Sequence, residues 1–137
     1  MQGEIIITEL DFTRLNSLIN STRGKNSPEI KNIEVLNTEI KRAKKVDSKN
    51  ISPEYITMNS VVKLTDMDTG KNIQLKLVYP KEADFRQGHI SVFSPLGSAL
   101  LGFKAGDTIA YEVPKGTKQI RIDEILYQPE ASGNFDA

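Results

Sequence analysis

The sequence predicts an α+β protein in which a helical hairpin precedes an antiparallel sheet that carries one short helix. Three observations predict this fold. Apolar residues recur at steps of three and four over residues 10–46, which is the spacing of one helix face. From residue 55 onward they alternate with polar residues, which is typical of half-buried strands. A Ser-Pro pair at residues 94–95 opens a short apolar segment in the second part, and such a pair is typical of a helix start.

Two helices are expected in the first part. Asp11 is the expected N-cap of the first helix, because a carboxylate there can accept hydrogen bonds from the free backbone N–H groups. A polar run over residues 20–26 ends this helix, and Ser27 and Pro28 predict the start of a second helix that extends to about residue 45. Because the connecting loop is short and each apolar stripe is narrow, the helices are predicted to lie antiparallel as a short coiled coil.

The second part is predicted to follow a polar linker over residues 47–53, so that residues 1–50 and 51–137 form two domains. Antiparallel strands are expected over residues 62–66, 73–79, 88–93, 109–113 and 120–127. The short helix is expected to begin with Ser94 as N-cap and Pro95 as its first residue, and to stop at Gly102.

The composition excludes several classes of protein. None of the 137 residues is cysteine, which excludes disulfides, thiol nucleophiles and cysteine metal sites. Lys and Arg number 18, as do Asp and Glu, and this zero net charge argues against a general nucleic-acid binder, which carries a basic excess. The N-terminus lacks the basic start and long apolar run of a signal peptide, and no apolar stretch is long enough to span a membrane. A cytoplasmic protein without membrane contact is therefore expected.

Few residues could carry chemistry. His89 is the only histidine, and a catalytic triad or a zinc site would need it together with oriented partners. Residues 97–104 resemble a phosphate-binding loop only superficially, because Phe103 separates the second glycine from Lys104 and Ala105 follows. We therefore expect no catalytic residue, no metal and no cofactor.

Charged residues cluster at four places. Carboxylates occur in pairs at residues 66/68, 82/84 and 123/124; such pairs can bind Mg²⁺, but solvated surface is expected for all three. A basic run over residues 41–45 is interpreted first as a favourable interaction with the C-terminal end of the second helix. The alternative is a contact with an acidic partner or with nucleic-acid phosphate.

Several strings in the second part follow one another in a specific order. They are Thr57-Met58-Asn59-Ser60-Val61-Val62, Asp68-Thr69-Gly70, the run from Ile90 to Gly102, and Gly106-Asp107. Their order and spacing resemble the C-terminal domain of the bacterial Gre transcript-cleavage factors. Two further strings, residues 77–80 and 127–130, are similar to the Rnk branch, the "regulator of nucleoside diphosphate kinase" proteins. The resemblance covers about residues 55–130 and implies an FKBP-like half-barrel for this part.

The resemblance also implies a partner, RNA polymerase. The C-terminal domain would dock on a coiled coil of the largest subunit at the rim of the secondary channel, and any contact with DNA or RNA would be indirect. The implied docking residues are Phe93, Ser94, Pro95, Leu96 and Leu100. Position 93 is often acidic in cleavage factors, so Phe93 would shift the contact from a salt bridge toward apolar burial. A monomer is expected.

The tip of the hairpin decides between regulation and cleavage. Cleavage factors carry acidic residues there, which help to hold the second Mg²⁺ of the polymerase. Residues 20–28 contain no Asp or Glu, and the tip residues Arg23, Gly24 and Lys25 would repel a metal ion. The second helix would also span only about 27 Å at about 1.5 Å per residue, less than in cleavage factors. We therefore expect a non-enzymatic factor that competes with Gre-type factors without stimulating cleavage.

Three alternatives remain open. The first is a Gre-like cleavage or elongation factor, which the composition of the tip disfavours. The second is a prolyl isomerase, which needs an aromatic-lined pocket, whereas this chain has no Trp and its five Phe and four Tyr are scattered. The third is a peptide-binding module that uses a sheet edge. No residue indicates a direct contact with a kinase.

Overall fold

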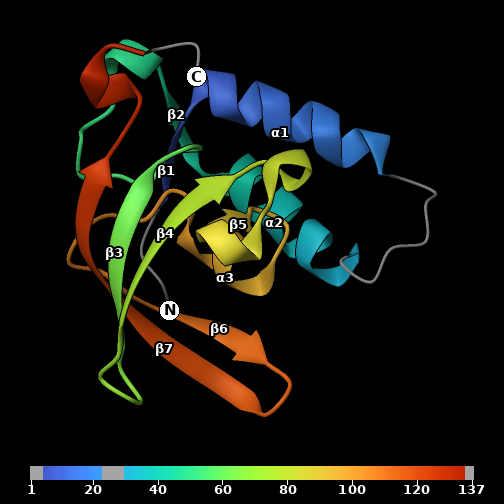
Figure 1. The fold of residues 1–137 in the computed structure, drawn as a ribbon. Coiled ribbons are helices and arrows are strands. Elements are labelled where there is room, and N and C mark those ends of the chain that lie inside the picture. Colours follow the sequence, from blue (N-terminus) through green and yellow to red (C-terminus); the bar gives the residue numbers. More distant parts are fainter. Residues whose placement is uncertain (1–4, 23–29, 135–137) are drawn as a thin grey trace.

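The computed structural model describes residues 5–22 and 30–134, and it confirms the α+β class (Figure 1). The first part contains β1 (Ile6–Thr8), α1 (Glu9–Ser21), α2 (Ile30–Arg42) and β2 (Lys44–Val46). The second part contains β3 (Val61–Asp66), β4 (Asn72–Val78), β5 (His89–Ser91), α3 (Pro95–Leu100), β6 (Thr108–Val113) and β7 (Gly116–Tyr127). Single 3₁₀ turns lie at η1 (Ser48–Asn50), η2 (Pro80–Glu82), η3 (Phe85–Gln87) and η4 (Glu130–Ser132).

The main sheet has the strand order β5-β4-β3-β7-β6 and curls into a half-barrel (Figure 1). Its alternating pattern buries one face: Val62 and Leu64 of β3 are buried whereas Lys63 between them is exposed. The expectation of a wholly antiparallel sheet is wrong for one pair, because β5 runs parallel to β4. The chain reverses twice between Tyr79 and Gly88 and re-enters beside β4 in the same direction.

The N-terminal isoleucines form a strand that the sequence analysis did not predict. β1 pairs in parallel with β2, so the second helix ends at Arg42 rather than near residue 45. The Ile6 N–H donates to the Gly102 carbonyl at 3.0 Å, which places β1 beside the end of α3. Gly102 has a φ of +86°, and a Cβ there would lie 2.7 Å from the Ile5 Cβ. β1 therefore needs a glycine at the position where the short helix stops.

The N-cap of α1 is Thr8, not Asp11. The Thr8 hydroxyl accepts the Asp11 N–H at 3.0 Å, so the helix begins at Glu9, ahead of the predicted cap. Asp11 thereby lies inside the first turn, and its side chain is only 1% exposed. The other predicted start, Ser27 and Pro28, lies outside the described residues.

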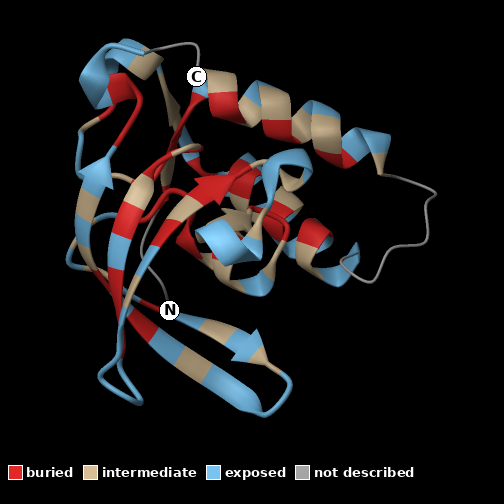
Figure 2. Cartoon of the chain, viewed as in Figure 1, coloured by how far each residue is buried: buried red, intermediate tan, exposed pale blue. Residues whose placement is uncertain are grey.

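One hydrophobic cluster joins the helices to the sheet. α1 contributes Leu15 and Ile19, and α2 contributes Ile33, Leu36 and Ile40. The same cluster includes the buried residues of the sheet and of α3, among them Val62, Leu64, Leu75, Leu77, Leu100, Ile120 and Ile122. In Figure 1, α1 runs away from the sheet and α2 returns toward it, and Figure 2 shows the buried residues between helices and sheet in red. The core therefore crosses the predicted boundary at residue 50.

Hydrogen bonds hold the predicted linker in place near both of its ends. Asp47 caps η1 by accepting the Lys49 N–H at 3.0 Å. The side-chain amide of Gln128 donates to the carbonyls of Ser52 and Tyr55, each at 2.8 Å. These bonds hold the segment after η1 against the end of β7, so its path is fixed.

Gly102→Ala should destabilise the protein more than Gly70→Ala does. Both glycines have positive φ, but a Cβ at Gly70 meets nothing within 4 Å whereas one at Gly102 meets Ile5. The backbone strain of roughly 1–2 kcal/mol is common to both, and overpacking adds about 1–3 kcal/mol at Gly102 alone. Urea unfolding of the two variants measures the difference. Equal midpoints would show that β1 does not pack against Gly102.

Candidate functional site

The Ser94-Pro95 turn is built as the sequence predicts. The Ser94 hydroxyl oxygen accepts the Gly97 N–H at 3.0 Å and donates to the Ser91 carbonyl at 2.7 Å. The Ser94 N–H donates to the same carbonyl at 3.0 Å. A Cβ at Gly97 would overlap that oxygen, so only glycine lets α3 approach the end of β5 so closely. The first turn of α3 is therefore held by hydrogen bonds against Ser91, the last residue of the edge strand β5.

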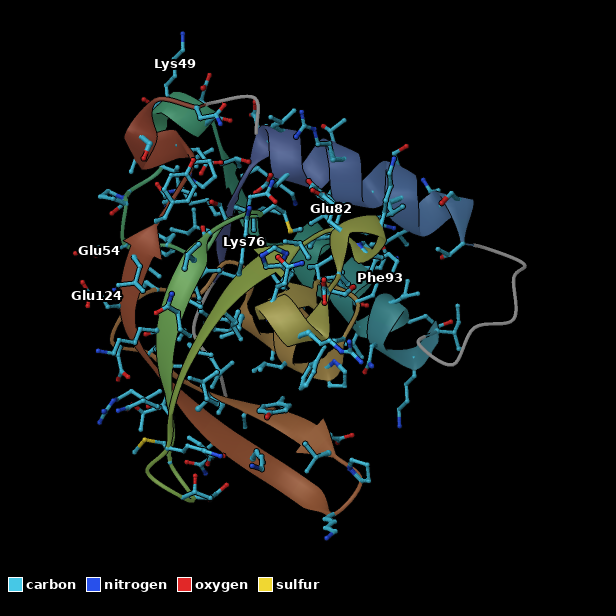
Figure 3. All side chains as sticks on the ribbon, in the orientation of Figure 1. Lys49, Glu54, Lys76, Glu82, Phe93 and Glu124 are labelled. Carbon is cyan, nitrogen blue, oxygen red and sulfur yellow. The ribbon has the colours of Figure 1, made fainter. Side chains whose placement is uncertain are left out.

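The five predicted docking residues divide into two groups. Pro95 is exposed, and Ser94 and Leu96 are half-buried, so these three can meet a partner. Phe93 and Leu100 are only 4% and 0% exposed and belong to the hydrophobic core. For these two the prediction needs correction, since a buried side chain supports α3 from beneath rather than offering a contact. Figure 3 shows Phe93 on the helical side of the sheet and Glu124 on the opposite side.

The loop between β4 and β5 presents an aromatic residue that the sequence analysis missed. Phe85 is 86% exposed, and it opens η3 beside β5. The backbone of Asp84 pairs with that of His89 at 2.9 and 3.0 Å, and Gly88 closes the turn with a φ of +74°. The signal in the sequence is local: an Asp N-cap and a Gly C-cap frame Phe85.

The region between α1 and α2 is only partly described. Arg23, Gly24 and Lys25 lie outside the described residues. The C-terminal end of α1 and the N-terminal end of α2 lie on one side of the molecule (Figure 1). The described residues of these two ends, 17–22 and 30–33, include no carboxylate. At its other end α2 stops at Arg42, before the end near residue 45 that the sequence predicts.

A buried carboxylate ties α1 to the sheet domain. Asp11 accepts the Met58 N–H at 3.0 Å. Burial raises the pKa of Asp11 to about 7; the nearby Glu130 carboxylate also raises it, while the Met58 N–H and Arg14 lower it. Glu130 itself accepts the Thr57 hydroxyl at 2.7 Å. These contacts join α1, the segment before β3 and the end of the chain.

The other candidate carboxylates serve structural roles. Asp66 is 4% exposed and forms an ion pair with Lys118 at 2.7 Å, and this lysine lowers the pKa of Asp66. The expectation of solvated surface is therefore wrong for Asp66, because a cation and backbone N–H groups compensate its burial. Asp123 accepts hydrogen bonds from Thr65 and Arg121. Among the described residues no group of three or more His, Asp or Glu side chains could hold a metal ion.

The basic run lies at the end of α2, as its first interpretation requires. The Lys45 ammonium donates to the Lys41 carbonyl at 2.6 Å and lies 4.6 Å from the centre of the Phe12 ring. Arg42 forms an ion pair with Glu39. Part of this charge is thus used in ending the helix. Within the described ranges, no helix is long and apolar enough to cross a membrane.

Comparison with known proteins adds two family matches. The family described as "Transcription elongation factor, GreA/GreB, C-term" matches residues 51–127, and the family "Rnk N-terminus" matches residues 4–46. The chain is 34% identical over 132 residues to the regulator of nucleoside diphosphate kinase of Escherichia coli K12, which covers 96% of this chain and 95% of that protein. The predicted resemblance is confirmed, and the Rnk match extends it to residues 4–46.

Two further similarities concern GreA-type factors. The chain is 40% identical over 96 residues to the transcription elongation factor GreA of Pelobacter propionicus, which covers 70% of this chain and 61% of that protein. It is also similar to the solved structure of a transcription elongation factor GreA/GreB from Nitrosomonas europaea. That match has a TM-score of 0.75 and 37% identity, and it covers 90% of this chain and all of the other.

Asp11→Asn should remove a pH dependence of stability. The pKa of Asp11 is about 7 in the folded protein and 3.8 for an exposed carboxyl of this type, so the protonated form stabilises the fold fully below pH ~4. This stability is lost as the pH rises through 7, with a slope of at most about 1.4 kcal/mol per pH unit. Asparagine stays neutral and can still accept the Met58 N–H. Urea unfolding from pH 4 to 8 measures the slope.

The control for this prediction is Glu34→Gln, which neutralises an exposed carboxylate on α2. We expect it to keep the wild-type slope, whereas Asp11→Asn should flatten the slope and gain stability at pH 7. An unchanged slope in Asp11→Asn would contradict the assignment of the raised pKa to this residue.

Proposed function

The chain belongs to the GreA/GreB and Rnk family of transcription factors, and from this premise we propose that it binds RNA polymerase at the secondary channel. There it competes with Gre-type factors and does not itself stimulate transcript cleavage. The observation that carries the proposal is the match of both parts of one chain, in order, to the two families. Related proteins bear the names of elongation factors and of a kinase regulator, and neither name is that of an enzyme.

In this proposal the two parts of the chain have different roles. Residues 51–137, as an FKBP-like half-barrel, anchor the protein on the largest-subunit coiled coil at the channel rim. Pro95, Ser94 and Leu96 make the contact, since they are the predicted docking residues that have accessible side chains. Residues 1–50, as a short hairpin, enter the channel. The shared core and the bond from Met58 to Asp11 support a fixed angle between anchor and hairpin.

The absence of cleavage follows from the chemistry of the tip. A second Mg²⁺ at the polymerase centre needs oxygen ligands, preferably carboxylates. Residues 20–28 offer none, and two of the predicted tip residues are basic. In this proposal the short hairpin fills part of the channel and blocks other factors without supplying the metal ligand.

A second candidate is a cleavage-stimulating factor, which the similarity to proteins named GreA favours. A prolyl isomerase is disfavoured, because such an enzyme needs an aromatic-lined pocket, whereas this chain has no Trp and its five Phe and four Tyr are scattered. For the name "regulator of nucleoside diphosphate kinase", an indirect effect through transcription is sufficient.

Added to backtracked transcription complexes, the protein should leave the RNA uncut and should slow cleavage by a Gre-type factor. A gel of the labelled transcript measures both effects at several Mg²⁺ concentrations. Pro95→Ala should compete about five- to tenfold less well, because a central contact of an interface is truncated. Metal-dependent shortening of the transcript by the protein alone would favour the second candidate instead.

The matched control is Pro114→Ala. Pro114 is also an exposed proline, and it lies in the turn between β6 and β7, away from α3. It should compete as the wild type does. Equal losses in the Pro95 and Pro114 variants would contradict a docking surface at α3.

A further inference from the structure

Phe85 is the large apolar residue with the highest exposure in the described part of the chain. Its exposed fraction is 86%, compared with 53% for Val35 and 46% for Met67. A single exposed apolar residue is common on protein surfaces, so exposure alone assigns no role. Its setting distinguishes Phe85 from the other two residues.

The backbone that carries Phe85 is held on both sides. Asp84 and His89 exchange two backbone hydrogen bonds, and the Asp84 carboxylate accepts the Arg86 N–H at 3.2 Å and the Gln87 side-chain amide at 2.6 Å. The Gly88 N–H donates to the Phe85 carbonyl at 3.1 Å. A ring on such a turn loses little backbone freedom when it binds, and this lowers the entropic cost of association.

Phe85 and Pro95 lie on the two turns that flank one short strand. β5 has three residues; its first, His89, pairs with Asp84, and its last, Ser91, holds Ser94. Two strand steps of about 3.3 Å separate the attachment points of these turns by about 7 Å. One α-helix is about 10–12 Å wide, so a helical partner on α3 reaches the neighbouring turn. Figure 2 shows the exposed turn of η3 in pale blue in front of α3.

We propose that Phe85 is a second anchor of the polymerase-docking surface, and that its ring inserts between the two helices of the largest-subunit coiled coil. This rests on the proposed function, because the partner is the one proposed for Pro95. A coiled coil offers apolar grooves beside charged flanks, and Phe85 is an exposed aromatic residue whose chain neighbours Lys81, Glu82 and Arg86 are exposed charges. Aromatic residues supply much of the binding energy at such contacts.

A second copy of this chain fits the surface less well. A stable dimer buries about 800 Å² on each partner. Phe85 is one exposed ring in a loop of exposed charged residues, and of the predicted docking residues only Pro95 and the half-buried Leu96 add accessible apolar surface. The surface around Phe85 is therefore too small to hold a dimer together by itself, but it can add to a larger interface.

The test is binding of the full chain to purified RNA polymerase, with Phe85→Ala, Phe85→Leu, Pro95→Ala and Met67→Ala. Met67 is the matched control, since it is exposed at the opposite end of β4. Phe85→Ala should weaken binding about tenfold, Phe85→Leu should weaken it less, and Met67→Ala should bind as the wild type does. Thermal melting should be unchanged in the Phe85 variants, because the ring makes few contacts within the fold.

The outcomes separate this inference from the proposed function. If the wild type does not bind polymerase, both fail. If the wild type binds and Pro95→Ala is weakened while Phe85→Ala is not, only the role of Phe85 is overturned. A photo-crosslinking phenylalanine derivative at position 85 should label the largest subunit. Labelling of a second copy, or a dimer in sedimentation that Phe85→Ala abolishes, would also overturn the inference.

Discussion

The carbonyl oxygen of Ser91 is the point on which much of the architecture depends. It accepts both the backbone N–H and the hydroxyl of Ser94, and it leaves no room for a side chain at Gly97. This contact sets the position of α3 against the edge of the sheet. The end of α3 then presents the Gly102 carbonyl to Ile6, which positions β1 and, through Thr8, the start of α1. A single acceptor at the end of β5 is thus linked to the placement of the helical part.

Local signals explain what could be predicted from the sequence. The alternation around Val62 and Leu64 and the Ser94-Pro95 start of α3 both lie within a few residues of the structure that they specify. β1 and β2 escaped prediction because three-residue strands leave little periodicity and because their partners lie far apart in the chain. The direction of β5 depends on the path of residues 79–88, which carries no signal of orientation. Asp11 was misassigned because Thr8, a better-placed cap, lies three residues earlier.

In the candidate site, too, local signals were predicted correctly and features that depend on packing were not. The motif around Ser94 and Pro95 located the turn correctly, but it could not say which neighbours face inward. Phe93 and Leu100 carry apolar side chains that suit an interface and a core equally well, and only the packing of α3 against the sheet shows that they are buried. Phe85 was missed because it is a single aromatic residue in a polar stretch. Its exposure depends on the tight turn that carries it.

The pairing of β1 with β2 closes the base of the helical arm, the segment formed by α1 and α2. Ile5 accepts the Lys44 N–H at 3.1 Å, so the chain enters and leaves the arm through adjacent, hydrogen-bonded strands. Whole turns can consequently be inserted at the distal end, in steps of about 5.4 Å of added length, without any change in the registers at the base. A homologue with this base could therefore carry longer or shorter helices while the contacts at the base remained the same.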